Sequence, residues 1–192
     1  MGRVLRRVGR VRGRAERSER GAALVEAALI LPLVLLIVFG ALEFSSLYKD
    51  AAVVSSAARA GGRIASAEPR NGQMPVDVAS AVATAISNLP ATSPQQLIVY
   101  DGSCSDPTAC ANSVSFTWNS STKSWNTGSY TAPGWIASQN VCTTNDSQWA
   151  RIGVYVKAQH PFITGLFGTG ASKTLTSKAV FRVEPVPSLQ CS

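Results

Sequence analysis

Four cysteines are the most reactive side chains in the chain, and they all lie in its last ninety or so residues: Cys104, Cys110, Cys142 and Cys191. They permit three disulfide pairings. The short segment "CSDPTAC" has Asp-Pro turn chemistry, which favours Cys104 with Cys110 and leaves Cys142 with Cys191. The alternative is a zinc site, but close Cys-x-x-Cys spacing is lacking and His160 is the only histidine. Disulfides are the better interpretation.

A search for catalytic groups finds little. His160 precedes Pro161, and no serine or cysteine motif marks it as a general base, so we expect a surface or structural histidine. Asp101 and Asp106 lack the spacing of a calcium loop and suit turns instead. We therefore expect no enzyme activity, no bound metal and no cofactor.

Aromatic side chains offer a binding hypothesis. Four tryptophans gather in the middle of the chain, where an exposed patch could hold a glycan, a peptide or a partner subunit. The alternative is that they pack in the core or in a hairpin. They are Trp118, Trp125, Trp135 and Trp149.

One charged side chain stands out by its surroundings. Glu26 lies near the front of an apolar run, Ala22 to Leu42, in which it is the only charged residue. A carboxylate inside a membrane segment costs a few kcal/mol at the centre and less near the interface. It either reaches the headgroups or has a specific partner.

The element that positions Glu26 is a membrane-length helix. Its 21 residues span about 30 Å, the thickness of a bilayer's hydrocarbon core. Residues 1–20 hold eight arginines and two glutamates, so they carry +6 of the net charge of +7. Arginines before a span stay in the cytoplasm, which places the rest of the chain outside. This location of the charge argues against nucleic-acid binding. A cleaved signal peptide, a simple signal-anchor and a buried core helix are the alternatives.

The helical pattern continues beyond the membrane. Small and apolar residues recur at three- and four-residue intervals until Pro69, which predicts one helix from about Ala22 to Ala67, some 70 Å long. Pro32 should kink it, and Gly61-Gly62 is a second weak point. A face of small residues would pack either on a neighbouring helix or on the protein's own head. That face comprises Ala51, Ser55 and Ala58.

The remaining chain predicts an α+β head. A second helix is expected over residues 76–89, and four β-branched or aromatic segments predict a small antiparallel sheet with the helices on one face. The segment "FTWNSSTKSW" predicts a hairpin between Trp118 and Trp125. The expected divisions are a leader (1–21), a transmembrane helix (22–42), its extracytoplasmic continuation (43–67) and a disulfide-bearing extracytoplasmic head (68–192).

The spacing between Gly21 and Glu26 resembles that of a known type of processing site. Gly21 ends the basic leader and Glu26 is the fifth residue after it, an arrangement that resembles the processing site of type IV prepilins. The resemblance implies cleavage after Gly21 by a prepilin peptidase. Ala22 then becomes the N-terminus, and Glu26 pairs with the terminal amine of a neighbouring subunit. Such a pair lowers the cost of both charges and fixes axial register.

The segment from Arg20 to Arg63 is more specifically similar to the TadE-like family of pilus assembly proteins. Ala27 differs from the phenylalanine or tyrosine that often follows the glutamate, and the segment from Asp101 to Trp149 has no counterpart in the resemblance. The end of the chain, "YVKAQHPFITGLFG" and "LTSKAVFRVEP", also looks like the family's closing strands. The matching features are Arg20 to Ala23, Val25-Glu26, Leu31-Pro32, Phe39-Gly40, Glu43-Phe44, Tyr48 and Ala57 to Gly61.

This resemblance implies a minor, pilin-like subunit of the tight-adherence pilus, with a pilin-like fold. Its partners would be the membrane, other pilin-like subunits, the assembly machinery and the prepilin peptidase, with no nucleic acid. Glu26, Pro32, Phe44 and Tyr48 are the candidates for helix packing in assembly. We expect a single-pass protein of the cytoplasmic membrane. A surface pilus is the alternative location. The competing hypothesis is an uncleaved signal-anchor whose head binds a glycan or peptide through its tryptophans.

Overall fold

The computed structural model describes residues 12–90, 93–139, 141, 150–165, 168 and 170–184, with the side chains of residues 12–20 left aside. Cys142, Cys191 and Trp149 lie outside these ranges, and so does the expected Cys142–Cys191 pair. By internal contacts the chain divides into two units, Met1–Phe44 and Ser45–Ser192. Each unit is described by itself.

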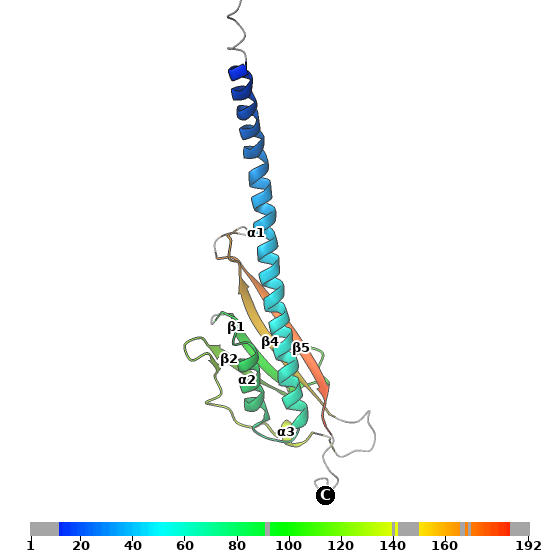
Figure 1. Cartoon of the computed structure of the whole chain (residues 1–192). Coiled ribbons are helices and arrows are strands. Elements are labelled where there is room, and N and C mark those ends of the chain that lie inside the picture. The colour runs from blue at the N-terminus through cyan, green and yellow to red at the C-terminus, as the bar shows by residue number, and fades with distance from the viewer. Residues whose placement is uncertain are drawn as a thin grey trace, which may run out of the picture. The chain divides into compact units, whose positions relative to one another are not determined.

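The first unit is dominated by the beginning of α1, a 56-residue helix from Arg12 to Ala67 (Figure 1). It is long and apolar enough to cross a membrane, and the most apolar stretch is not buried at all. Leu24 and Leu29 are 71% and 75% exposed. Leucines this exposed need an apolar environment, which a bilayer supplies.

The ends of α1 partly differ from expectation. Arg12, the first described residue, is already helical, so the helix extends at least ten residues before Ala22. Arginine, which is frequent in this leader, is a good helix former. It ends at Ala67 as predicted, two residues before Pro69. Pro32 lies inside it without ending it.

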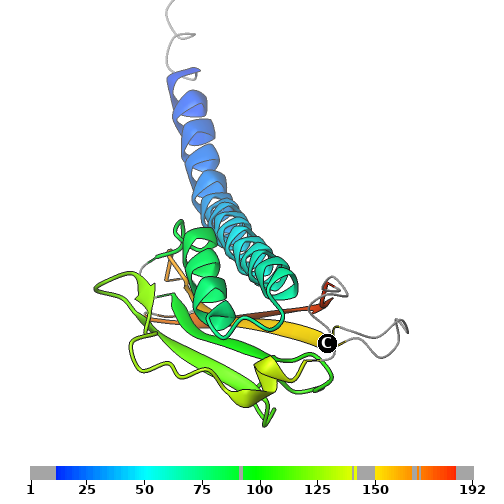
Figure 2. The ribbon, with the colours of Figure 1, turned by 90° about the horizontal axis from the view of Figure 1, so that it is seen from below.

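The second unit contains a five-stranded antiparallel sheet in the order β3-β2-β1-β4-β5. Its helices lie over one face of the sheet (Figure 2), so the expected α+β, pilin-like architecture is confirmed. The helix α2 begins two residues earlier and ends four residues earlier than expected. A short helix, α3, was not predicted from the sequence. The bounds are α2 Met74–Ala85, β1 Pro94–Asp101, β2 Ser113–Asn119, β3 Ser124–Trp125, α3 Gly134–Ala137, β4 Arg151–Pro161 and β5 Ser172–Arg182.

Alternation along β1 divides its side chains between two cores. Leu97 and Val99 belong to the main core beneath the helices, whereas Ile98 and Tyr100 belong to a small second cluster with Cys110. Opposite faces of a strand alternate with period two, so these clusters lie on the two faces of the sheet. The helix-covered face is the larger core.

The glycine pair of α1 is a packing site and not a weak point. A Cβ on Gly61 would lie 2.8 Å from Val82 of α2 and 3.2 Å from Val154 of β4. One on Gly62 would lie 2.4 Å from the ring of Phe181 on β5. Lack of side chains here lets the helix backbone approach α2 and the sheet, and the close packing offsets the helix-weakening effect of glycine.

The small-residue face of α1 also finds its partner within the head. Ala58 is fully buried in the main core, whereas Ala51 and Ser55 are half-buried. Ala51 and Ser55 line an open groove of about 620 Å³ together with the exposed Tyr48 and Arg59. The sequence left open whether this face packs on a neighbouring helix or on the head. The structure shows that Ala58 packs in the core of the head.

Candidate membrane anchor and assembly site

The predicted processing residues are accessible. Gly21, Ala22 and Glu26 all lie exposed on α1, and a Cβ on Gly21 would meet no atom within 4 Å. Ala22 and Glu26 are four residues apart, so their side chains are neighbours on one face of the helix. Gly21 therefore has no packing role in the described structure.

The other predicted assembly residues are exposed too. Phe44, in the first unit, is 65% exposed, and Tyr48, in the second, is 78% exposed. Pro32 is exposed and continues the helix. Large aromatic side chains this accessible are available to a membrane interface or to another subunit.

The tryptophans are mainly structural. Trp125 is 4% exposed in the main core, and Trp118, opposite it in the β2–β3 hairpin, packs at a centroid distance of 4.9 Å with its ring nearly perpendicular. Trp135 packs against the same core. The hairpin prediction is confirmed, with Trp125 buried and Trp118 and Trp135 half-buried against the core.

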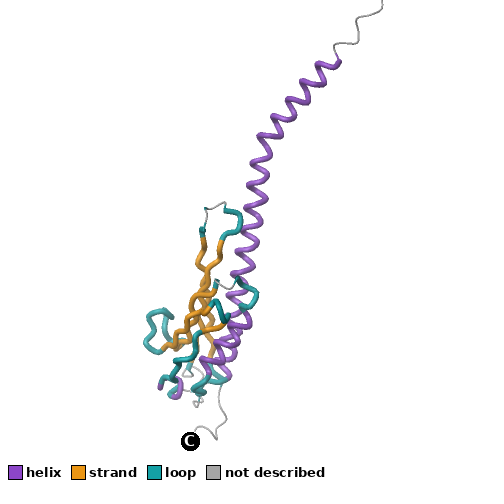
Figure 3. Tube along the Cα trace, turned by 90° about the vertical axis from the view of Figure 1, so that its left-hand side faces the viewer, coloured by secondary structure: helices purple, strands orange, loops and turns teal. Residues whose placement is uncertain are grey.

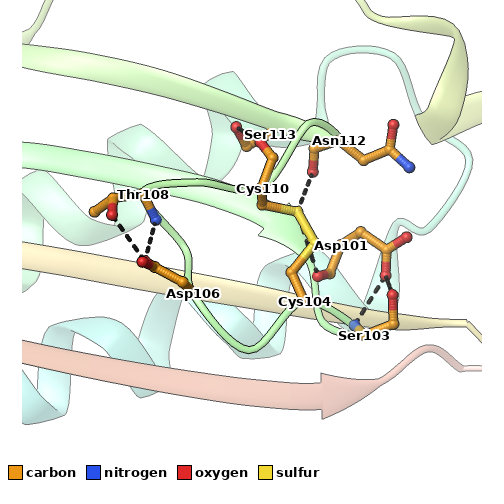
Figure 4. The surroundings of a disulfide bond; sticks show 8 residues. All are labelled: Asp101, Ser103, Cys104, Asp106, Thr108, Cys110, Asn112 and Ser113. Carbon is orange, nitrogen blue, oxygen red and sulfur yellow. Dashed lines mark hydrogen bonds between the residues drawn. A yellow bond between two sulfur atoms is a disulfide. The ribbon is translucent and has the colours of Figure 1, made fainter.

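The first predicted disulfide forms. Cys104 and Cys110 are joined, with Cα atoms 5.8 Å apart (Figure 4). The backbone N–H and hydroxyl of Ser103 donate to Asp101, and those of Thr108 donate to Asp106. The Thr108 bonds hold the pKa of Asp106 below its usual value. Both aspartates thus serve turns, as the sequence indicated.

This loop covers the sheet face away from the helices. Cys110 and Cys104 pack with Ile98, Tyr100 and Tyr155 in the second cluster. Lys178 of β5 donates to the carbonyl of Ser105 at 3.4 Å. The disulfide therefore closes a small core that the sheet alone would leave open.

A buried hydrogen bond between Asp50 and His160 joins α1 to β4 within the second unit. His160 Nδ1 lies 2.7 Å from Asp50 Oδ2, and the two residues are 2% and 8% exposed. Phe162 packs edge-on against the imidazole, with centroids 5.6 Å apart. His160 is thus a structural histidine. Sequence carried no signal for its partner, which is 110 positions away.

In the described part of the chain, no three of His, Cys, Asp and Glu gather where they would hold a metal ion. What the geometry provides is an exposed apolar helix with one carboxylate, followed by a head that packs on the helix's later turns. That arrangement suits anchoring and assembly.

Comparison with protein families decides which class of anchored protein this segment resembles. Residues 21–63 match the TadE-like protein family. The TadE-like segment begins at Gly21 and ends just after the glycine pair that packs on α2 and the sheet. No curated protein and no solved structure matches the chain. The match confirms the resemblance to the TadE-like family that was drawn from the segment between Arg20 and Arg63.

Proposed function

We propose that this chain is a minor, pilin-like subunit that takes part in assembling a tight-adherence pilus. The observation that carries the proposal is the TadE-like segment, residues 21–63, which starts at the glycine where a prepilin peptidase would cut. The apolar helix supplies the membrane anchor, with the arginine-rich leader in the cytoplasm and the head outside.

Glu26 is the residue on which assembly depends in this proposal. Once the leader is removed, Ala22 carries a positive α-amine, and Glu26 lies one turn further into the helix. A neighbouring subunit offset by four residues, about 6 Å, brings its amine level with this carboxylate. Mutual neutralisation then makes assembly favourable inside lipid.

Mass spectrometry of the mature protein tests processing. We expect an N-terminus at Ala22, and its loss in Gly21→Val. Gly40→Val is the matched control, because Gly40 lies on the same helix and also has no atom within 4 Å of its added Cβ. Retention of Met1 in the wild type would contradict the proposal.

Fibre formation tests the role of Glu26. Glu26→Gln keeps size and polarity but removes charge, so it should be processed and inserted normally while fibres are lost. Glu26→Asp keeps the charge and should retain part of the assembly. Normal fibres from Glu26→Gln would rule out the charge-pairing step but not the processing site.

A further inference from the structure

The edge of the sheet at β5 has no partner strand in the part of the chain that the structure describes. β5 is the last strand in the order β3-β2-β1-β4-β5, so it pairs with β4 on one side only. Within the second unit, α1 (purple in Figure 3) lies over a face of the sheet (orange). Thr174, Thr176 and Lys178 of β5 are exposed. An exposed edge strand of 11 residues is a template for another strand.

Hydrogen bonds at the two ends of β5 show which of its backbone groups face outward. Before the strand, Phe162 N–H donates to the carbonyl of Ala171, and after it Val183 N–H donates to the carbonyl of Ala150. Odd-numbered residues of β5 therefore bond to β4, because the register is unbroken and successive residues of a strand alternate. Even-numbered residues direct their N–H and C=O groups away from β4.

Four of these outward-facing residues have backbone groups without a hydrogen bond to any other described residue. They are Thr174, Thr176, Lys178 and Val180. Glu184, just beyond the strand, confirms the direction, because its N–H donates to the carbonyl of Ser66 on α1 and not to β4. Each of the four residues offers one donor and one acceptor. This repeat is the one that the backbone of another extended chain matches.

The charges of β4 and β5 indicate an acidic occupant for this edge. The two strands contain five basic residues and no aspartate or glutamate. They are Arg151, Lys157, Lys173, Lys178 and Arg182. Opposite charges on neighbouring strands stabilise their pairing, and like charges destabilise it. The edge therefore disfavours pairing with β5 of a second copy and favours an acidic strand.

We propose that β5 accepts an extended acidic segment of a partner protein, which adds a further strand to the sheet along residues 174–180. Backbone hydrogen bonds supply the affinity. Carboxylates of the segment pair with Lys173 and Lys178, which lie on opposite faces of the sheet, and supply the selectivity. The site requires neither cleavage after Gly21 nor a membrane, so it goes beyond the proposed function.

Binding of designed peptides to the full chain in detergent tests the site. The probe is a fluorescent decapeptide of alternating glutamate and valine, and fluorescence anisotropy measures its affinity. One control peptide alternates lysine and valine. The other is the glutamate–valine peptide with every backbone nitrogen methylated, which keeps the charge but lacks backbone donors. We expect the probe to bind and both controls to bind severalfold more weakly or not at all.

Proline substitution locates the bound peptide on the sheet. Thr176→Pro removes only an outward-facing N–H, so the bonds to β4 remain and the variant should fold but lose affinity for the probe. Ser115→Pro is the matched control on β2. The carbonyl of Thr117 accepts from Asn126, so Ser115, two residues earlier, also directs its N–H away from β1. This variant should bind the probe as the wild type does, and hydrogen exchange checks that both variants keep the sheet.

Charge reversal tests the selectivity. Lys173→Glu/Lys178→Glu should lose the glutamate–valine peptide and gain affinity for the lysine–valine peptide, a change that general damage to the fold would not produce. Lys123→Glu is the control, because this exposed lysine lies between β2 and β3. It should change neither affinity.

Three results would overturn the site, and none of them bears on processing at Gly21. If the glutamate–valine peptide does not bind, the basic residues only protect the edge from aggregation. Equal binding of the methylated peptide would show attraction by charge without strand pairing. Loss of binding in Ser115→Pro but not in Thr176→Pro would place the peptide on β2.

Discussion

At the scale of single residues, the second core depends on a tyrosine packed over a glycine. Tyr100 and Gly153 are direct partners in the β1–β4 ladder, and a Cβ on Gly153 would lie 2.2 Å from Cζ of the tyrosine ring. Gly153 is therefore the residue that admits the ring. The Tyr100 side chain is 1% exposed, and burial raises its pKa above the usual value near 10.

This raised pKa predicts loss of stability in alkali. The neutral phenol is favoured in the fold, so its contribution is fully present below the unfolded pKa and is lost as pH rises through the folded pKa. The free energy of unfolding, measured by denaturant titration in detergent, should fall above about pH 10. Tyr100→Phe should reduce that fall.

Tyr48→Phe is the control for the alkaline effect, because Tyr48 is 78% exposed. It should leave the pH profile as in the wild type. Tyr130 and Tyr155 also have pKa values raised by burial, so Tyr100→Phe removes a share of the effect and not all of it. Superimposable profiles for Tyr100→Phe and wild type would contradict the assignment to Tyr100.

At the scale of elements, α1 places glycine where a helix former would be expected. In an exposed helix, Gly→Ala is stabilising by about 1 kcal/mol. At Gly62 the new methyl group would overlap the ring of Phe181 at 2.4 Å. Overpacking of this kind costs about 1–3 kcal/mol and should outweigh the gain in propensity.

Gly62→Ala should therefore lower the free energy of unfolding, as measured by denaturant titration of the full chain in detergent. Gly40→Ala is the matched control on the same helix, because its Cβ would meet nothing within 4 Å. The double variant Gly62→Ala/Phe181→Leu should recover part of the loss. A stabilised Gly62→Ala would show that the helix moves away from β5 without cost.

Local signals explain which elements the sequence could predict. Pro69 fixed the end of α1, and alternating β-branched residues located all four longer strands. The start of α2 at Met74 was missed because Pro75 was interpreted as part of a loop, although proline is well suited to the first turn of a helix. The role of Gly61-Gly62 was missed because it depends on Val82, Val154 and Phe181, which are distant in sequence.

At the scale of the whole molecule, the sequence could predict only those features whose residues lie close together in the chain. Gly21 and Glu26 lie five residues apart, and the Cys104–Cys110 pair is six apart, so both patterns are visible in the sequence. Asp50 and His160 meet only through the path of β4 along α1. Their pair holds one end of the sheet to α1.

Breaking this pair should loosen the β4–β5 end of the head selectively. Asp50→Ala leaves His160 buried without its partner, a loss of about 1–3 kcal/mol. Hydrogen exchange of the full chain should increase in residues 158–165 while the β1–β2 ladder stays protected. Asp50→Asn retains an oxygen that accepts from Nδ1, so its effect should be smaller.

A double-mutant cycle distinguishes the energetic coupling of Asp50 with His160 from a general loss of stability. Removing both partners in Asp50→Ala/His160→Ala should cost less than the sum of the two single variants, because the second substitution removes a group already left unsatisfied. Additive losses would contradict a direct coupling. Faster exchange in β1–β2 as well as in residues 158–165 would show that the pair stabilises the whole sheet and not only the end where β4 meets β5.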